Sequence, residues 1–144
     1  MKTQISLIPT DHCERMMNAA LQLLAPAIER SNGRWTIEDV KDGLIEGREQ
    51  LWLVFNKEKD IVAASTTMIQ AYPNMDMLEI IFLGGVGFDE WSESSVNVLK
   101  SFAKDCGCDG IETIGRKGFL KPMKGRGFNT PYVVYENLFE RKVS

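Results

Sequence analysis

Apolar and polar residues alternate in several short segments of the chain, and this pattern predicts strands. One half-buried strand is expected at residues 2–8, where apolar side chains alternate with polar ones. Two apolar, β-branched segments at 50–55 and 61–69 are separated by a polar turn, which predicts an antiparallel hairpin. A nearly continuous apolar segment at 77–83 predicts a central strand that is covered on both faces.

Apolar residues at helical spacing predict three helices. The first follows Asp11 and Glu14, which are spaced like a capping box, and it is expected to end near residues 31–33. Thr36 is expected to cap the second helix, and Ser92 is expected to cap the third. The first two helices follow one another directly and predict a paired cover on one side of the sheet.

The third helix lies between the strand at 77–83 and a short apolar segment at 111–114. A strand, a helix and a second strand in this order predict a crossover that joins two parallel strands. A last apolar segment at 132–139 predicts an antiparallel strand that closes the sheet. No repeat or linker divides the chain, so residues 1–144 are expected to form a single domain.

The composition narrows the class of protein. Apolar residues make up 44% and charged residues 26%, which is typical of a soluble globular protein. The sequence shows no membrane span and no signal peptide, so we expect a cytoplasmic protein. Three cysteines are not a disulfide framework, and a single histidine argues against a histidine-rich metal site, so no metal is expected.

The charge is unevenly distributed, although the net charge is only −3. No acidic residue lies between Glu112 and Glu136, while five basic residues do: Arg116, Lys117, Lys121, Lys124 and Arg126. This basic segment could hold a phosphorylated ligand, nucleic acid or an acidic partner, and a solvated basic loop is an equally good interpretation.

Together the elements and a set of short motifs resemble the GNAT-type N-acetyltransferase superfamily. More narrowly, the chain is similar to GNAT-like proteins encoded by bacteriophages. The resemblance implies an α/β (α+β) fold of three layers, in which helices cover both faces of a mixed, mostly antiparallel sheet of about six strands. The motifs are LWLV at 51–54, Gly84-Gly85, AKDCGC at 103–108, GRKGF at 115–119 and GF at 127–128.

The resemblance also implies a site for acetyl-CoA where the two parallel strands splay apart. The pantetheine would bond to the edge of the strand at 77–83, and the pyrophosphate would lie at the start of the following helix. The cofactor-binding residues implied in this way are Phe82, Leu83, Gly84, Gly85, Val86, Gly87, Ser92 and Arg116.

Two residues are implied to act on the acceptor amine and the leaving thiolate. Glu79 interrupts an apolar strand, so it points either into a cleft or to an exposed position, and in the cleft it would be the general base. Met123 stands where many members of the superfamily place a tyrosine. Tyr132 or Tyr135 would then protonate the thiolate in its place, or the thiolate would leave unassisted.

The same resemblance leaves a second function open. In place of the superfamily's arginine- and glycine-rich loop, the third helix carries three acids at its start, Asp89, Glu90 and Glu93. These acids would repel a pyrophosphate or stabilise the helix N-terminus. The alternative is therefore a non-catalytic GNAT-like bacteriophage structural or accessory protein, with a phage or host partner, in the host cytoplasm or the virion. A nucleic-acid-binding module ranks last, since the chain is acidic overall.

Overall fold

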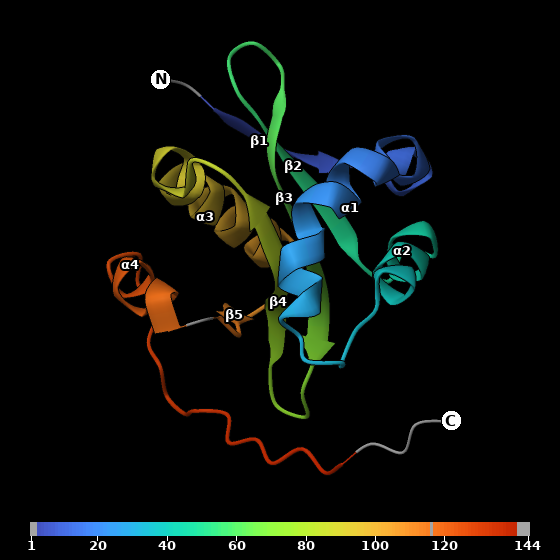
Figure 1. Cartoon of the computed structure of the whole chain (residues 1–144). Helices are drawn as coiled ribbons and strands as arrows, with labels where there is room; N and C mark the ends of the chain where they lie inside the picture. Colours follow the sequence, from blue (N-terminus) through green and yellow to red (C-terminus); the bar gives the residue numbers. More distant parts are fainter. Residues whose placement is uncertain (1–2, 116, 141–144) are drawn as a thin grey trace. The chain divides into compact units, whose positions relative to one another are not determined.

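Five strands form one mixed sheet in the computed structural model of the chain, which describes residues 3–115 and 117–140 (Figure 1). The spatial order follows the sequence; each neighbouring pair is antiparallel except the last, which is parallel. The described residues thus contain five strands rather than about six. They are β1 (Gln4–Ile8), β2 (Gln50–Phe55), β3 (Ile61–Ala71), β4 (Asp76–Gly85) and β5 (Gly110–Thr113).

Helices cover both faces of the sheet and make three layers, as predicted (Figure 1). α1 (Cys13–Glu29) and α2 (Ile37–Ile45) lie on one face, and α3 (Phe88–Asp105) lies on the other. We call these the α1/α2 face and the α3 face. The sheet and these helices belong to one compact unit, Met1–Ile114, and Gly115–Ser144 form a second unit.

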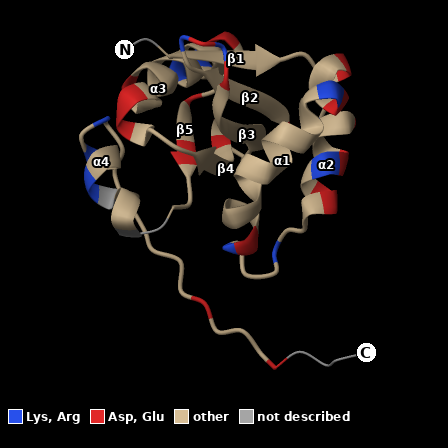
Figure 2. Cartoon of the chain, turned by 45° about the horizontal axis from the view of Figure 1, so that its top comes forward, with Lys and Arg blue, Asp and Glu red and all other residues tan. Residues whose placement is uncertain are grey.

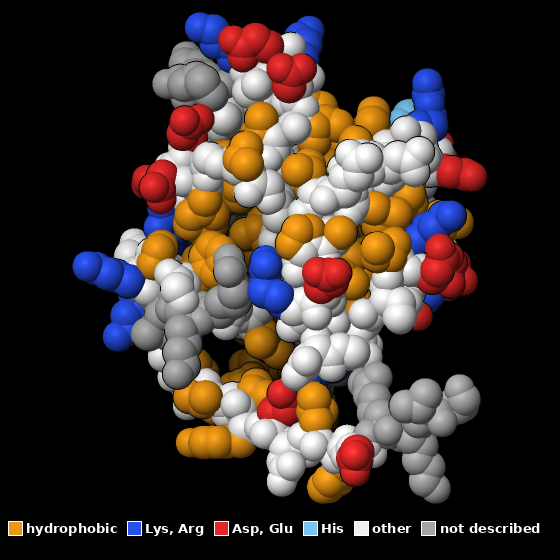
Figure 3. Space-filling view, in the orientation of Figure 1, with side chains coloured by type: hydrophobic (Ala, Val, Ile, Leu, Met, Phe, Trp, Pro, Cys, Tyr) orange, Lys and Arg blue, Asp and Glu red, His pale blue; other side chains and the backbone are white. Residues whose placement is uncertain are grey.

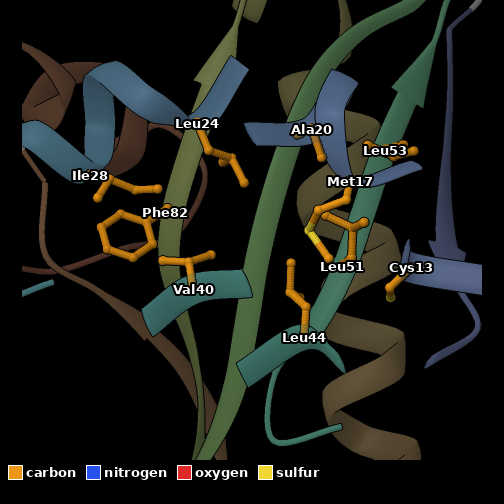
Figure 4. Close-up of a cluster of buried hydrophobic side chains, with 11 residues drawn as sticks. Cys13, Met17, Ala20, Leu24, Ile28, Val40, Leu44, Leu51, Leu53 and Phe82 are labelled. Carbon is orange, nitrogen blue, oxygen red and sulfur yellow. The ribbon is translucent and has the colours of Figure 1, made fainter. Parts of the chain in front are cut away.

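The largest hydrophobic cluster lies between the sheet and the first two helices (Figure 4). Leu24 of α1, Leu44 of α2 and Leu51 of β2 are completely buried there. Burial of a leucine side chain stabilises a fold by about 1.5–3 kcal/mol. Because side chains of a strand alternate between its faces, Leu51 also fixes the α1/α2 face as the side to which every second residue of β2 points.

The two helix starts on this face differ from one another. At α2 the predicted cap is confirmed: Thr36 Oγ1 accepts the N–H of Asp39 at 3.2 Å, and the Asp39 carboxylate accepts the N–H of Thr36 at 2.9 Å. The hydrogen bond from the Thr36 backbone lowers the pKa of Asp39. At α1 the expected box of Asp11 and Glu14 is wrong, because a 3-10 turn, η1 (Thr10–His12), takes that place.

The third helix begins five residues earlier than predicted. Its N-cap is Gly87, in the left-handed region at φ 75°, and its first residue is Phe88. Ser92 therefore does not cap α3; it is buried one turn inside the helix. The start is fixed by Trp91, whose Nε1–H donates to the Val86 carbonyl at 2.8 Å and whose ring packs edge-on against Phe88.

The second unit contains η2 (Lys117–Phe119) and α4 (Leu120–Lys124). The predicted last strand at 132–139 is wrong, since the structure gives residues 128–140 no helix or strand. Strand propensity depends on a partner strand and a buried face, and the large apolar side chains here are exposed. Figure 3 shows hydrophobic side chains along this segment, which is red in Figure 1.

Two further features of the described residues bear on the class of protein. None of the helices in the described ranges has the length and apolar character that a membrane crossing requires. The three cysteines, Cys13, Cys106 and Cys108, are free thiols.

Candidate functional site

The parallel strands β4 and β5 pair over only part of their length. Their register runs from Met77 and Gly110 to Ile80 and Thr113, where β5 ends. The Thr113 hydroxyl closes this ladder by donating to the Ile80 carbonyl at 2.8 Å. Beyond Ile80, β4 continues to Gly85 with β3 on one side and no β5 partner on the other. This open edge, Ile81–Gly85, lies where the resemblance implied a splay between the two strands.

A bulge in β4 lies at the start of the open edge. Thr67 of β3 pairs with Ile80 and Thr66 pairs with Phe82, so Ile81 is one residue too many on β4. The extra residue changes the alternation of side chains. Ile80 packs on the α3 face, whereas Phe82 packs on the α1/α2 face with the main cluster.

The bulge places Glu79 and Phe82 on the same face. Glu79 precedes Ile80 and follows Leu78, both of which pack on the α3 face, so its own side chain lies on the α1/α2 face. Glu79 is half-buried, and its Oε1 accepts a hydrogen bond from Gln70 Nε2 of β3 at 2.8 Å. The ring of Trp35, which precedes α2, stands edge-on to Phe82 with 5.7 Å between the ring centroids.

Gly84 and Gly85 lie inside β4 rather than in a loop. A Cβ at Gly84 would overlap the backbone carbonyl of Leu23 in α1, and one at Gly85 would overlap the Val62 carbonyl and Ala63 of β3. Close packing against the neighbouring elements therefore accounts for both glycines.

The turn between the open edge and α3 consists of Val86 and Gly87. The Val86 N–H is already bonded to the Val62 carbonyl at 2.9 Å, and no side chain caps the first turn of α3. Asp89 and Glu90 belong to this first turn and are exposed. The helix start thus combines backbone N–H groups that attract an anion with two acids that repel one.

The remaining predicted site residues lie in other places. Ser92 is only 1% exposed. Tyr132 belongs to the second unit, where its side chain is 71% exposed, and its role stays a prediction. Arg116 lies outside the described residues. The structure thus brings together Glu79, Phe82 and Leu83 beside the open edge.

Sequence reasoning missed a buried carboxyl, Glu49, directly before β2. Its side chain is 3% exposed, and neither of its carboxylate oxygens has a hydrogen-bond partner. Burial raises the pKa of Glu49 to about 7; Glu79 acts in the same direction, while Arg48 and Thr66 oppose it. Glu49 precedes Leu51 by two residues, so strand alternation was a signal that could have placed it on the α1/α2 face.

The described residues hold no cluster of three or more His, Cys, Asp or Glu side chains that could bind a metal ion. The site must therefore be interpreted from its carboxyl groups, its open strand edge and its helix start.

Comparisons with known proteins identify the fold. The chain is similar to glucosamine-6-phosphate N-acetyltransferase from Arabidopsis thaliana, with a TM-score of 0.65, 12% identity, and coverage of 97% of this chain and 100% of that one. It is also similar to the aminoglycoside acetyltransferase meta-AAC0020 from an uncultured soil metagenomic sample, with a TM-score of 0.69, 14% identity and 97% coverage of both chains.

A third similar structure is a transcriptional regulator from Bacillus halodurans C-125, with a TM-score of 0.67, 15% identity, and coverage of 96% of this chain and 100% of that one. No protein-family model and no curated protein matches the sequence. The likeness therefore establishes a GNAT-like fold over nearly the whole chain. Because one fold carries many functions, the activity must be argued from the site.

Proposed function

We propose that the chain is an N-acetyltransferase that moves an acetyl group from acetyl-CoA to an amine. The observation that carries the proposal is the end of the β4–β5 ladder at Ile80 and Thr113, directly beside the half-buried carboxyl of Glu79. An open strand edge can bind an extended ligand through its backbone, and a carboxyl beside it can accept a proton. The two similar acetyltransferases support this interpretation through their fold.

Two parts of the chain fit acetyl-CoA, which would supply an acetyl group activated as a thioester. The open edge at Ile81, Phe82 and Leu83 offers backbone groups that β5 does not use. At the start of α3, backbone N–H groups that no side chain caps would bind the pyrophosphate. Asp89 and Glu90 oppose an anion at this place. The fit is therefore stronger for the pantetheine than for the pyrophosphate.

The chain's own residues would then move the protons. Glu79, oriented by Gln70, would take the proton of the acceptor's ammonium, so that the neutral amine can attack. The backbone of Leu83 would polarise the thioester carbonyl. The new nitrogen–carbon bond forms as the carbon–sulfur bond breaks, and the second amine proton ends on the leaving sulfur, a transfer for which Tyr132 is the proposed acid.

Calorimetric titration with acetyl-CoA, and with CoA in parallel, tests the coenzyme half of the proposal. We expect binding of micromolar affinity. Glu90→Gln removes a negative charge from the start of α3 and should tighten binding about threefold, because like charges repel. Glu58→Gln, in the turn between β2 and β3, removes the same charge elsewhere and should change nothing.

The catalytic half is tested with Glu79→Gln. This variant should bind acetyl-CoA as the wild type does but acetylate amines about a hundredfold more slowly, the range that a general base contributes. Full turnover in the variant would remove Glu79 from the mechanism. If no acetyl-CoA binds even at high concentration, the enzyme proposal is wrong and the non-catalytic, partner-binding alternative takes its place.

A further inference from the structure

The strands of the sheet carry charge of one sign only. No lysine or arginine lies in any of the five strands, and their three charged residues are all acids: Asp76, Glu79 and Glu112. Figure 2 shows red bands on otherwise tan strands. Outside the strands, basic residues are as common as acidic ones. The sheet is therefore more acidic than the net charge of the chain suggests.

Two of these acids and Glu49 share one face and one row of the sheet. In the register, Glu79 of β4 stands opposite Met68 of β3 and opposite Glu112 of β5. Glu112 follows Ile111, which packs on the α3 face, so its side chain lies on the α1/α2 face with Glu79. Glu49 lies on the same face. It directly precedes Gln50, which pairs with Thr67, so the same register continued by one residue places Glu49 opposite Met68.

The row has a length that suits an extended ligand. Neighbouring strands are about 4.8 Å apart, and the row crosses three gaps from β2 to β5, so it spans about 14 Å. Glu79 and Glu112 are direct neighbours in it, and Glu49 is two strands from Glu79.

Neutral donors orient the carboxylates of Glu79 and Glu112. Gln70 donates to Glu79 at 2.8 Å, and the Tyr72 hydroxyl donates to both oxygens of Glu112 at 2.7 and 3.0 Å. Among the described residues, no lysine or arginine forms an ion pair with either acid. Arg48 is the nearest base to Glu49 in sequence, and its guanidinium is paired with Glu46 at 2.7 Å. No described base therefore pairs with Glu79 or Glu112.

Glu49 provides an independent sign that the row lacks hydrogen-bond donors. A buried carboxyl normally has hydrogen-bond donors, and an unsatisfied one destabilises the fold. Both oxygens of Glu49 are buried without a partner, and so is the hydroxyl of Thr66 beside it. A cation bound along the row would offset this cost, because it favours the charged form of Glu49.

We propose that Glu79, Glu112 and Glu49 form a binding site for an acceptor amine that carries at least two positive charges. The inference rests on the proposed acetyltransferase function and assigns its substrate class. The ammonium that reacts lies at Glu79, and a second ammonium lies at Glu112. Glu49 touches neither; it acts as a positioning residue that strengthens the negative potential behind them.

The experiment is calorimetric titration of the full chain at low ionic strength with spermidine, which has three positive charges. Butylamine, which has one, is the comparison ligand, and acetyl-CoA is titrated separately. Spermidine should bind at least tenfold more tightly than butylamine, since each added ion pair in a partly buried site contributes on the order of a factor of ten.

Variants then locate the site. Glu112→Gln should weaken spermidine binding about tenfold and leave butylamine binding unchanged, because only the second ammonium loses its partner. Glu58→Gln removes one negative charge at the opposite end of β2 from Glu49, and spermidine should bind this control like the wild type. Two results would overturn the proposal. One is equal spermidine affinity in the wild type, Glu112→Gln and Glu58→Gln; the other is a wild type that binds spermidine no more tightly than butylamine.

The role of Glu49 has its own readout. At pH 7 its carboxyl is about half protonated, so spermidine binding should release up to about half a proton. Titration in two buffers of different ionisation enthalpy measures this release, which Glu49→Gln should abolish. Unchanged proton release in this variant would exclude Glu49 from the site.

The two proposals can fail separately. If acetyl-CoA binds and spermidine does not, the substrate class is wrong and the acetyltransferase proposal stands. If spermidine binds with the expected variant pattern and acetyl-CoA does not, the acidic row is a polycation site in a protein that is not an acetyltransferase.

Discussion

The two faces of the sheet treat their buried polar residues differently, and two adjacent threonines of β3 show this most clearly. On the α3 face, Thr67 Oγ1 accepts the indole N–H of Trp52 at 2.9 Å and donates to Gln50 Oε1 at 2.8 Å. On the α1/α2 face, Thr66 is buried just as completely, and its hydroxyl has no partner.

The same contrast extends to the neighbours of each threonine. Ser65, on the α3 face, donates to the Phe82 carbonyl at 2.8 Å. Glu49, on the α1/α2 face, has two buried oxygens without a partner. Each unsatisfied buried group costs about 1–3 kcal/mol. Among the residues of the strands and of the segment directly before β2, the bonded polar groups on the α3 face stabilise the sheet, whereas the unbonded ones on the α1/α2 face lower its stability and mark the side on which we expect a ligand. On the α3 side, the buried hydroxyl without a partner is that of Ser95, which belongs to the helix α3 and not to the sheet.

The largest expected effect concerns the packing of α1 against β4 on the α1/α2 face. Gly84→Ala would place a Cβ onto the Leu23 carbonyl, and a backbone atom cannot move aside as a side chain can. We expect the free energy of unfolding to fall by about 3 kcal/mol or more, measured by urea denaturation.

Gly118→Ala is the control for this prediction, since a Cβ at Gly118 would meet nothing within 4 Å. Its free energy of unfolding should stay within about 0.5 kcal/mol of the wild type. If Gly84→Ala is equally harmless, α1 does not press on β4 as closely as the structure shows.

The next largest effect is the pH dependence that Glu49 imposes. Its pKa is raised from 4.5 to about 7, so between these pH values the folded protein binds more protons than the unfolded chain. The stabilising contribution of the protonated form is complete below the unfolded pKa and is lost as the pH rises through about 7.

Glu49→Gln keeps the shape of the side chain and removes this titration. The difference in free energy of unfolding between variant and wild type should therefore change by about 2 kcal/mol in favour of the variant from about pH 5 to about pH 8. Urea denaturation of both proteins at the two pH values measures it. A difference that stays constant with pH would mean that Glu49 is solvated, and the contrast between the faces would weaken.

A smaller effect is expected on the α3 face. Thr67→Val keeps the volume of the side chain and removes the hydroxyl that joins Trp52 to Gln50. The indole N–H then remains buried without an acceptor, which should lower the free energy of unfolding by about 1–2 kcal/mol. Trp52 fluorescence during urea denaturation would follow both the local change and the loss of stability.

Much of the fold could be predicted from the sequence, because periodicity reports directly on buried faces. The strands of the hairpin, the central strand and the crossover to β5 were found in this way, and the Thr36 cap was found from its spacing to Asp39. The start of α3 was missed because Ser92 is a typical cap residue. Gly87 takes that position instead, and the Trp91 contact with the Val86 carbonyl fixes it.

The site was less predictable because it depends on register. Glu79 was found as a charge within an apolar strand, but the bulge at Ile81, which brings Phe82 to the same face, has no signal in the sequence. Glu112 became part of the site only through its register with Glu79. The last strand was predicted from propensity alone, and the structure places no strand partner beside residues 132–139.

The smallest expected effect is the most direct test of the contrast between the faces. Thr66→Val, the neighbour and exact counterpart of Thr67→Val, removes a buried hydroxyl that has no hydrogen-bond partner to lose. The free energy of unfolding should therefore change by less than about 0.5 kcal/mol, or rise, because desolvation of an unsatisfied hydroxyl is relieved. A loss of stability as large as that of Thr67→Val would mean that the Thr66 hydroxyl is bonded in solution, and the two faces would then differ only in charge.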